Sequence, residues 1–211
     1  MVEPKYIAIE GPIGVGKTSL TNRLAEKFGF KPVYEEFEEN PFLADFYSDR
    51  KGFAFQTQLF FLLSRYRQQE KLFQLDLFEQ GLVSDYLFAK DRIFAHINLD
   101  DNEIILYEQI YKLLNARVLK PDLVIFLQAS VDQLIKRIKK RGRSYEKNID
   151  SHYLKDLSDA YNRFFFHYKE SPLLVVNTNQ MNLAGEDAPF NDLIREISNM
   201  RGGVRHLVRN M

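Results

Sequence analysis

Eight residues near the start of the sequence have the types and the spacing of a phosphate-binding loop. They fit the pattern Gly-x-x-x-x-Gly-Lys-Thr and are Gly11, Pro12, Ile13, Gly14, Val15, Gly16, Lys17 and Thr18. In such a loop the backbone N–H groups turn toward the phosphates, the lysine reaches the β- and γ-phosphates, and the threonine hydroxyl can hold Mg²⁺. Apolar residues 6–9 before the loop and a helical pattern over residues 19–25 after it supply the strand and the helix that the loop needs. The sequence therefore predicts that the chain binds a nucleoside triphosphate, with Mg²⁺ carried by the nucleotide.

Two carboxylates directly follow other predicted strands. Glu35 comes after residues 32–34, and Asp85 comes after residues 82–84. Ligands of open α/β sheets bind at the carboxyl ends of the strands, so Glu35 could accept a proton from a hydroxyl group and Asp85 could position Mg²⁺. A solvated acidic turn is the alternative for Glu35, because four of residues 35–39 are glutamates. An ordinary strand-terminal residue is the alternative for Asp85.

Basic residues crowd a predicted helix that ends at a glycine turn. Among the lysines and arginines of residues 136–143, we single out Arg137, Arg141 and Arg143 as cations of a lid that closes over the phosphates. A solvated face of an amphipathic helix would explain the same pattern.

These groups together favour a kinase over the other proteins that use such a loop. A kinase needs a base for the acceptor hydroxyl, a carboxylate for the metal and cations around the transferred phosphoryl group, and the sequence offers a candidate for each. A GTPase would need an Asn-Lys-x-Asp sequence to recognise guanine, and the chain has none.

The elements that must position these residues follow an α/β pattern. Short apolar runs alternate with longer helical patterns, and they predict a five-stranded parallel sheet with helices on both faces. The runs are residues 6–9, 32–34, 82–84, 123–128 and 173–176. With 211 residues and no linker, the sequence predicts a single domain over residues 1–211, of which residues 201–211 could be a flexible tail.

The composition excludes several classes of protein. Basic and acidic residues balance at 29 each, so no global attraction to nucleic acid or to an anionic membrane is expected. The absence of cysteine excludes disulfides, thiol catalysis and thiolate metal sites, and the four histidines are too scattered to suggest a zinc site. There is no signal pattern and no apolar run of membrane-spanning length. We expect a soluble cytoplasmic protein whose partner is a small molecule.

Over nearly its whole length the sequence resembles the deoxynucleoside kinases, and within them the bacterial deoxyadenosine/deoxyguanosine kinase branch. The resemblance is carried by the loop at residues 11–18, by Glu35 and by the segments 55–65, 85–91 and 141–146. It implies a P-loop kinase fold with an arginine-rich lid, and transfer of phosphate from ATP to the 5′-hydroxyl of a deoxynucleoside, with purines favoured. A homodimer is common in such enzymes. Its interface could use apolar residues that core packing would explain equally well, namely Leu72, Phe73, Leu75, Leu77 and Phe78.

The resemblance also implies roles for residues near the acceptor. Glu35 corresponds to the general base, and Lys17 and the lid arginines would neutralise the γ-phosphate. Gln58 corresponds to the glutamine that pairs with the edge of the nucleobase, and Arg65 with Asp91 corresponds to an ion pair beside that base. Gln58 and Arg65 are seven residues apart, which predicts that they share one face of a helix.

For the sugar, the resemblance implies that Tyr47 and Glu146 hold the 3′-hydroxyl, with Tyr47 also crowding the 2′ position. A core aromatic residue is the alternative for Tyr47. Several phenylalanines could form walls around the base or could simply be core residues: Phe42, Phe55, Phe60, Phe61 and Phe88.

One position departs from the pattern of this family. An arginine usually follows the acidic residue of the third strand directly, whereas here Tyr86 follows Asp85. Lys90 and Arg92 are the cations downstream. Either one of them supplies the missing charge or the catalytic step is tuned differently.

Two rival functions remain at the level of the sequence. A thymidylate-type nucleotide kinase shares the expected sheet and an Arg-Gly-Arg lid, but it would need a cationic site for the phosphate of its acceptor, which Glu35 would repel. A noncatalytic relative could keep the fold as a structural subunit, and intact Lys17, Thr18 and Glu35 argue against it.

Overall fold

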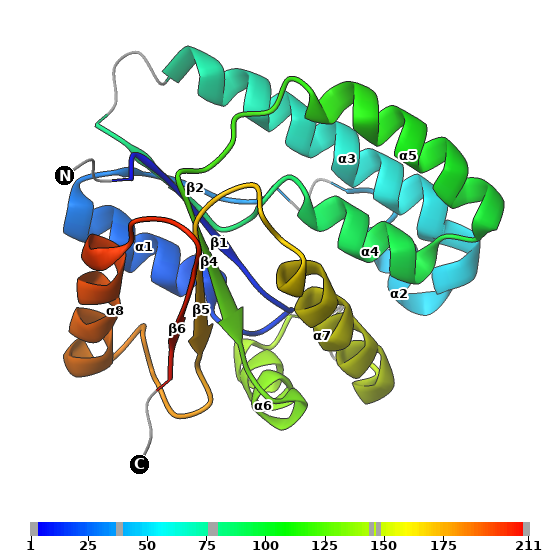
Figure 1. Cartoon of the computed structure of the whole chain (residues 1–211). Helices are drawn as coiled ribbons and strands as arrows, with labels where there is room; N and C mark the ends of the chain where they lie inside the picture. Colours follow the sequence, from blue (N-terminus) through cyan, green and yellow to red (C-terminus); the bar gives the residue numbers. More distant parts are fainter. Residues whose placement is uncertain (1–3, 37–39, 76–79, 144–145, 147–148, 209–211) are drawn as a thin grey trace.

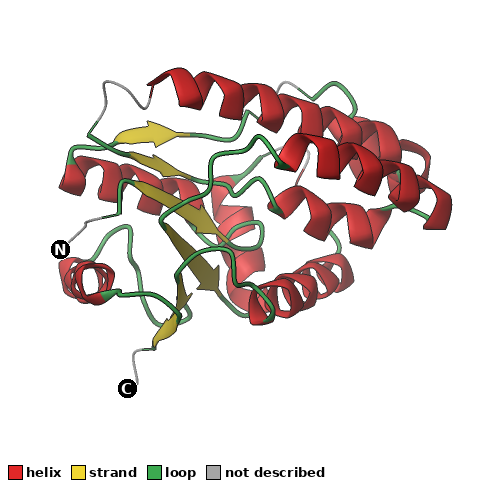
Figure 2. Cartoon of the chain, turned by 45° about the horizontal axis from the view of Figure 1, so that its top comes forward, coloured by secondary structure: helices red, strands yellow, loops and turns green. Residues whose placement is uncertain are grey.

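A parallel β-sheet forms the centre of the computed structural model, which describes residues 4–36, 40–75, 80–143, 146 and 149–208. Within these residues six strands lie in the order β2-β3-β1-β4-β5-β6 (Figure 1, Figure 2). They are β1 (Tyr6–Glu10), β2 (Lys31–Val33), β3 (Leu82–Ser84), β4 (Leu123–Gln128), β5 (Leu173–Asn177) and β6 (Val204–Leu207). Ile7 of β1 pairs with Val83 of β3 on one side and with Leu123 of β4 on the other. The loop that follows β1 therefore leaves the sheet between two neighbouring strands.

The inner strands are buried on both faces, which explains their apolar sequences. Successive side chains of a strand point to opposite faces of the sheet. In β1, Ile7 and Ile9 pack into one core, and Tyr6 and Ala8 pack into the other. The same alternation holds in β4 and β5. A strand covered on both faces needs a continuous apolar run, as residues 123–127 have.

Helices cover both faces of the sheet, as the sequence predicts. The first core includes residues of α1 (Lys17–Phe28), α6 (Val131–Arg141) and α8 (Asp187–Asn199). The second includes residues of α4 (Lys90–Asn98) and α7 (Ser151–Phe166), which lie across the sheet from α1 and α8 in Figure 1. Farther from the sheet, α3 (Arg50–Leu75) and α5 (Asp101–Asn115) pack on α4, and the short α2 (Leu43–Ser48) packs on α3. Among the described residues there is no helix that combines the length and the apolar character of a membrane span.

The sixth strand corrects two expectations from the sequence. The prediction of five strands was wrong, and four residues assigned to a possible flexible tail form β6. Hydrogen bonds to β5 hold it in parallel, in a register that runs from Leu173 and Val204 to Val176 and Leu207. Its side chains are exposed or partly exposed, in contrast to those of the inner strands. Such a strand lacks the apolar run by which the inner strands were recognised.

Candidate active site

The loop between β1 and α1 has a backbone that favours glycine at three positions. The φ angles of Gly11, Gly14 and Gly16 are 149°, 83° and 108°. Space adds a second requirement at Gly11, because a Cβ atom there would lie 2.4 Å from the carbonyl oxygen of Leu127. Since α1 begins at Lys17, its N-terminal N–H groups lie at the loop. The loop therefore has the backbone form that phosphate binding requires.

Lys17 carries the positive charge of this loop. Its Nζ donates to the carbonyl oxygens of Gly11 at 2.7 Å and of Pro12 at 3.3 Å. Burial, and then the nearby Lys90 ammonium, lower the pKa of Lys17 to about 8, while three nearby carboxylates act in the opposite direction. The group is thus a cation at neutral pH, in a place where a phosphate would strengthen its charged form.

Asp85 connects the loop to the strand-end carboxylate. Its Oδ2 accepts a hydrogen bond from Oγ1 of Thr18 at 2.6 Å, and its Oδ1 accepts one from the backbone N–H of Glu35 at 2.8 Å. Carboxylate and hydroxyl oxygens are ligands that Mg²⁺ prefers. Among the described residues no three acidic, His or Cys side chains gather as a metal cluster. Thr18 and Asp85 therefore fit a Mg²⁺ that also takes oxygens from a nucleotide.

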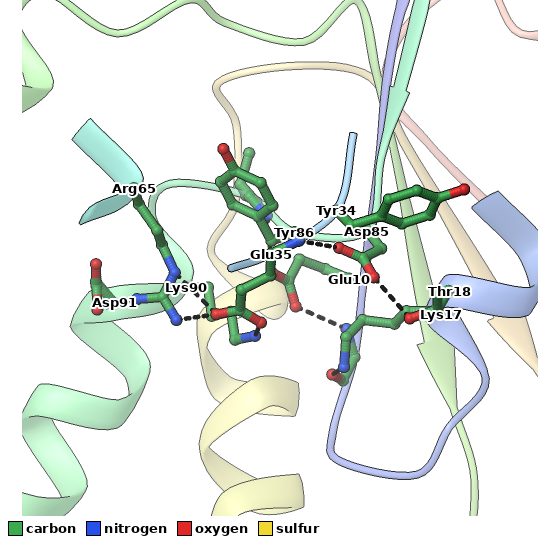
Figure 3. Close-up of polar contacts among 12 residues, drawn as sticks. Glu10, Lys17, Thr18, Tyr34, Glu35, Arg65, Asp85, Tyr86, Lys90 and Asp91 are labelled. Carbon is green, nitrogen blue, oxygen red and sulfur yellow. Dashed lines mark hydrogen bonds and ion pairs between the residues drawn. The ribbon is translucent and has the colours of Figure 1, made fainter. Parts of the chain in front are cut away.

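Glu35 lies between two cations (Figure 3). Nε of Arg65 donates to its Oε1 at 3.0 Å, and Nζ of Lys90 donates to its Oε2 at 2.5 Å. Only 13% of the Glu35 side chain is exposed. Burial alone would raise the pKa of this carboxyl group, but Arg65 and Lys90 outweigh burial and hold the pKa well below its usual range. The carboxylate is therefore ionised, and Glu35 is not part of a solvated acidic turn. Residues 37–39 of the acidic run lie outside the described residues.

Arg65 bridges two carboxylates, those of Glu35 and Asp91. Its contact with Asp91 is the ion pair that the family resemblance implied. Its Nη1 donates to Oδ1 of Asp91, while the other edge of the guanidinium contacts Glu35. Asp91 is fully buried behind Arg65, and burial raises its pKa to about 6 against the opposing effect of Arg65. Gln58 lies two turns away on the same helix, and both Gln58 and Arg65 line the cavity, as their spacing predicts. Oε1 of Gln58 is buried with no hydrogen-bond partner among the described residues.

The structure distinguishes the two cations that follow Tyr86. Lys90 contacts Glu35, whereas Arg92 pairs with Glu108 of α5 at 2.8 Å and leaves 41% of its side chain exposed. Tyr86 is fully buried, and its hydroxyl accepts a hydrogen bond from Nε2 of Gln69 at 3.5 Å. Of the two cations, Lys90 is therefore the one that contacts the strand-end carboxylate of Glu35.

The lid arginines have different surroundings. Arg141 and Arg143 both pair with the buried carboxylate of Glu146, the latter at 3.7 Å. Arg137 instead donates to the carbonyl oxygens of Val15 at 3.0 Å and of Thr178 at 2.8 Å, so it links the phosphate loop to the end of β5. Residues 144 and 145 of the predicted lid lie outside the described residues.

A single cavity of about 830 Å³ brings these groups together. The phosphate loop, Glu35, Lys90 and the three lid arginines line it together with the sugar and base candidates Tyr47, Glu146, Gln58 and Arg65. Of the five candidate phenylalanines, Phe61 lines the cavity and Phe88 stacks on Tyr111 in the core. The remaining three are not among the lining residues.

Sequence reasoning missed two features of this site. Glu10, at the end of β1, is fully buried and accepts hydrogen bonds from the N–H groups of Gly11 and Leu87, at 2.9 Å and 2.8 Å. Burial raises the pKa of Glu10. Thr178 and residues 181–184 line the cavity beyond β5. The sequence could have indicated Thr178, because this residue lies just beyond the end of a strand, as Glu35 and Asp85 do.

Comparisons with known proteins agree in family and in fold. A family model described as deoxynucleoside kinase matches residues 7–201. A deoxyguanosine kinase of Bacillus subtilis (strain 168) is 43% identical over 157 residues, which are 74% of this chain and 76% of that protein. A deoxyadenosine kinase of Lactobacillus acidophilus is 33% identical over 92% of this chain and 94% of its own length. The solved structure of deoxyadenosine kinase from M. mycoides with bound dATP superimposes with a TM-score of 0.77 and 29% identity, over 93% of this chain and 100% of the other.

Proposed function

The chain belongs to the deoxynucleoside kinase family, and we propose that it transfers the γ-phosphoryl group of ATP to the 5′-hydroxyl of a purine deoxynucleoside. The observation that carries this proposal is that one cavity is lined by the phosphate loop, by Glu35 and by Gln58, whose Oε1 has no hydrogen-bond partner among the described residues. The relatives named above as deoxyguanosine and deoxyadenosine kinases support the preference for purines.

In the proposed reaction, O5′ of the nucleoside attacks the γ-phosphorus as the bond to the leaving oxygen of ADP breaks. Glu35 has a low pKa, so it is a weak base before the reaction begins. It orients O5′ by accepting its hydrogen bond, and it takes the proton once the new bond to phosphorus has made the hydroxyl more acidic. Positioning by the carboxylate is thus as important as its basicity.

Charge neutralisation is the second part of the proposed mechanism. Lys17 contacts the β- and γ-phosphates from the loop, and Arg141 and Arg143 approach them from the lid. Thr18 and Asp85 would hold Mg²⁺, which supplies electrostatic stabilisation to the phosphate oxygens when bound. Arg137 acts through the loop, because it lines the cavity and contacts Val15 and Thr178.

Recognition of the nucleoside completes the proposal. Gln58 binds the edge of the base, and Arg65, fixed by Asp91, lies beside it. Tyr47 and Glu146 hold the 3′-hydroxyl of the sugar. A thymidylate-type kinase is not favoured, because the acceptor phosphate of a nucleotide would lie against the ionised Glu35.

We also propose that the enzyme is a cytoplasmic homodimer. Three apolar side chains of α5 are exposed, namely Ile105 at 60%, Leu106 at 48% and Leu113 at 74%. Leu106 and Leu113 are seven residues apart and so share one face of the helix, and a contiguous exposed apolar face can mark an interface. Leu72, which the sequence offered for the interface, is buried within the chain, and the other four candidates fall outside the described side chains.

Light scattering should show a dimer that Leu113→Glu dissociates; a monomeric unmodified chain would exclude the dimer. The cytoplasm is where ATP and deoxynucleosides are available.

Transfer of labelled γ-phosphate from ATP with Mg²⁺ to a panel of acceptors tests the function. The panel contains the four deoxynucleosides, adenosine and thymidine monophosphate, and a reaction without acceptor measures ATP hydrolysis. We expect label in the monophosphates of deoxyadenosine and deoxyguanosine. Label in thymidine diphosphate would instead assign a nucleotide kinase. No transfer to any acceptor would assign a noncatalytic relative.

A further inference from the structure

Lys90 presents a buried ammonium group to the carboxylate that the proposed function uses as its base. It is the first residue of α4, and 7% of its side chain is exposed. Its Nζ donates to Oε2 of Glu35 at 2.5 Å and lies 5.6 Å from the ring centre of Phe94. Lys90 lines the same cavity as Lys17. One ammonium group of this cavity therefore contacts the phosphate loop, and the other contacts Glu35.

The hydrogen bonds of Lys90 are incomplete without a ligand. A lysine ammonium has three N–H donors, and one of them is used by Glu35. The other two have no acceptor among the described residues. Unsatisfied donors on a buried cation cost free energy unless an anion or water accepts their hydrogen bonds. Because Lys90 lines the cavity, an anionic group of the substrate can supply these acceptors.

The proposed reaction needs a cation at this place. The transferred phosphoryl group carries negative charge on three oxygens and must move toward Glu35, which is itself negative. Lys17 lies at the phosphate loop, on the side of the ADP leaving group. Arg65 is already paired with Glu35 and Asp91. Arg92 is occupied by Glu108. Lys90 is the cation that touches Glu35 and still has unused donors.

We propose that Lys90 is the acceptor-side catalytic cation: it holds the Glu35 carboxylate and neutralises the phosphoryl group as it passes to O5′. This inference rests on the proposed phosphoryl transfer. The bond from O5′ to phosphorus forms as the bond from phosphorus to ADP breaks, and the hydroxyl proton passes to Glu35. Lys90 keeps its proton throughout, and its two remaining N–H groups donate to phosphoryl oxygens.

The test compares Lys90→Ala with the matched control Arg92→Ala, two residues along the same helix. Turnover of Lys90→Ala should fall by about 10²-fold or more, the scale for losing one electrostatic contact to a transition state. The dissociation constant of the nucleoside should change by less than about threefold. Arg92→Ala should keep turnover within about twofold.

Chemical rescue separates a charge in the reaction from a structural role. Methylammonium, which can occupy the space left by the lysine, should raise the turnover of Lys90→Ala by about tenfold or more, and it should not affect Arg92→Ala. Tetramethylammonium has no N–H donor and should not rescue either variant. If Lys90→Ala does not fold, Lys90→Gln replaces it, because glutamine keeps a donor for Glu35 without the charge.

Turnover of Lys90→Ala within about threefold of the unmodified enzyme would overturn the inference. So would a loss of turnover that follows a parallel loss of nucleoside binding and shows no rescue by methylammonium. In either case an active unmodified enzyme would leave the proposed function intact. An unmodified enzyme that transfers phosphate to no nucleoside would overturn both.

Discussion

Replacing Glu35 by glutamine should lower both turnover and stability, because it removes one charge from a buried cluster. The carboxylate contacts Arg65 at 3.0 Å and Lys90 at 2.5 Å, and each contact is worth about 6 kcal/mol at an effective dielectric constant of about 20, before desolvation. Glutamine keeps the shape, but its amide nitrogen is a donor and would face a group that can only donate.

The net loss of stability should be about 3 to 5 kcal/mol, the usual cost of breaking a buried ion pair by removing one partner. For a chain of 211 residues this corresponds to a fall in Tm of about 10 °C. Turnover should fall by about 10² to 10⁴-fold, since the proton acceptor is lost. Thermal melts and the γ-phosphate transfer assay measure both effects. Glu36→Gln is the matched control, because Glu36 is exposed, and it should change neither.

The double variant Glu35→Gln/Lys90→Met separates the two effects. Arg65 keeps its pairing with Asp91 and can donate to the oxygen of the new amide, so removal of Lys90 leaves no unpaired ammonium group facing the amide nitrogen. Several degrees of Tm should return relative to Glu35→Gln, while turnover stays low. The reasoning is refuted if Glu35→Gln melts within about 2 °C of the unmodified protein, or if Glu36→Gln has the larger effect on turnover.

Four further predictions concern the phosphate loop and the nucleoside. Lys17→Ala should abolish transfer and change Tm by less than about 2 °C, because this lysine acts on phosphate and not on the core; near-normal turnover would remove the kinase assignment. In the unmodified protein, kcat/KM for ATP should fall as the pH rises through about 8, where Lys17 loses its proton, whereas kcat at saturating ATP should not, since bound phosphate keeps Lys17 charged. A parallel fall of both parameters would assign the titration to another group. Gln58→Ala should raise KM for the nucleoside and relax base choice, because its buried Oε1 has no partner in the part of the chain that the structure describes and is therefore available to the base; an unchanged substrate ranking would exclude contact with the base. Tyr47→Phe and Glu146→Gln should each weaken substrates that carry a 3′-hydroxyl and leave dideoxy analogues little changed, and equal losses for both kinds of substrate would contradict the sugar assignment.

Several parts of this protein could be recognised from the sequence because their signals are local. The phosphate loop is a pattern of eight consecutive residues, and its strand and helix lie directly beside it. Glu35 and Asp85 were found because each directly follows a predicted strand, and parallel strands bring their carboxyl ends to one edge of a sheet. The parallel sheet with helices on both faces followed from the alternation of apolar runs and helical patterns, and the structure confirms it. The sequence did not predict β6, because an edge strand needs no apolar run.

Only the tertiary structure decided how the charges are paired. Lys90 and Arg92 are equivalent in the sequence, two cations shortly after Asp85, yet one contacts Glu35 and the other contacts Glu108. The family resemblance likewise implied a place for Arg65 beside the base, but not its second contact, with Glu35. These contacts join residues 55 and 30 positions apart on different elements. Spacing within a helix or a loop is set by local backbone geometry. The direction in which α4 presents Lys90 depends instead on how α3, α4 and the sheet pack together. No local sequence pattern specifies that packing.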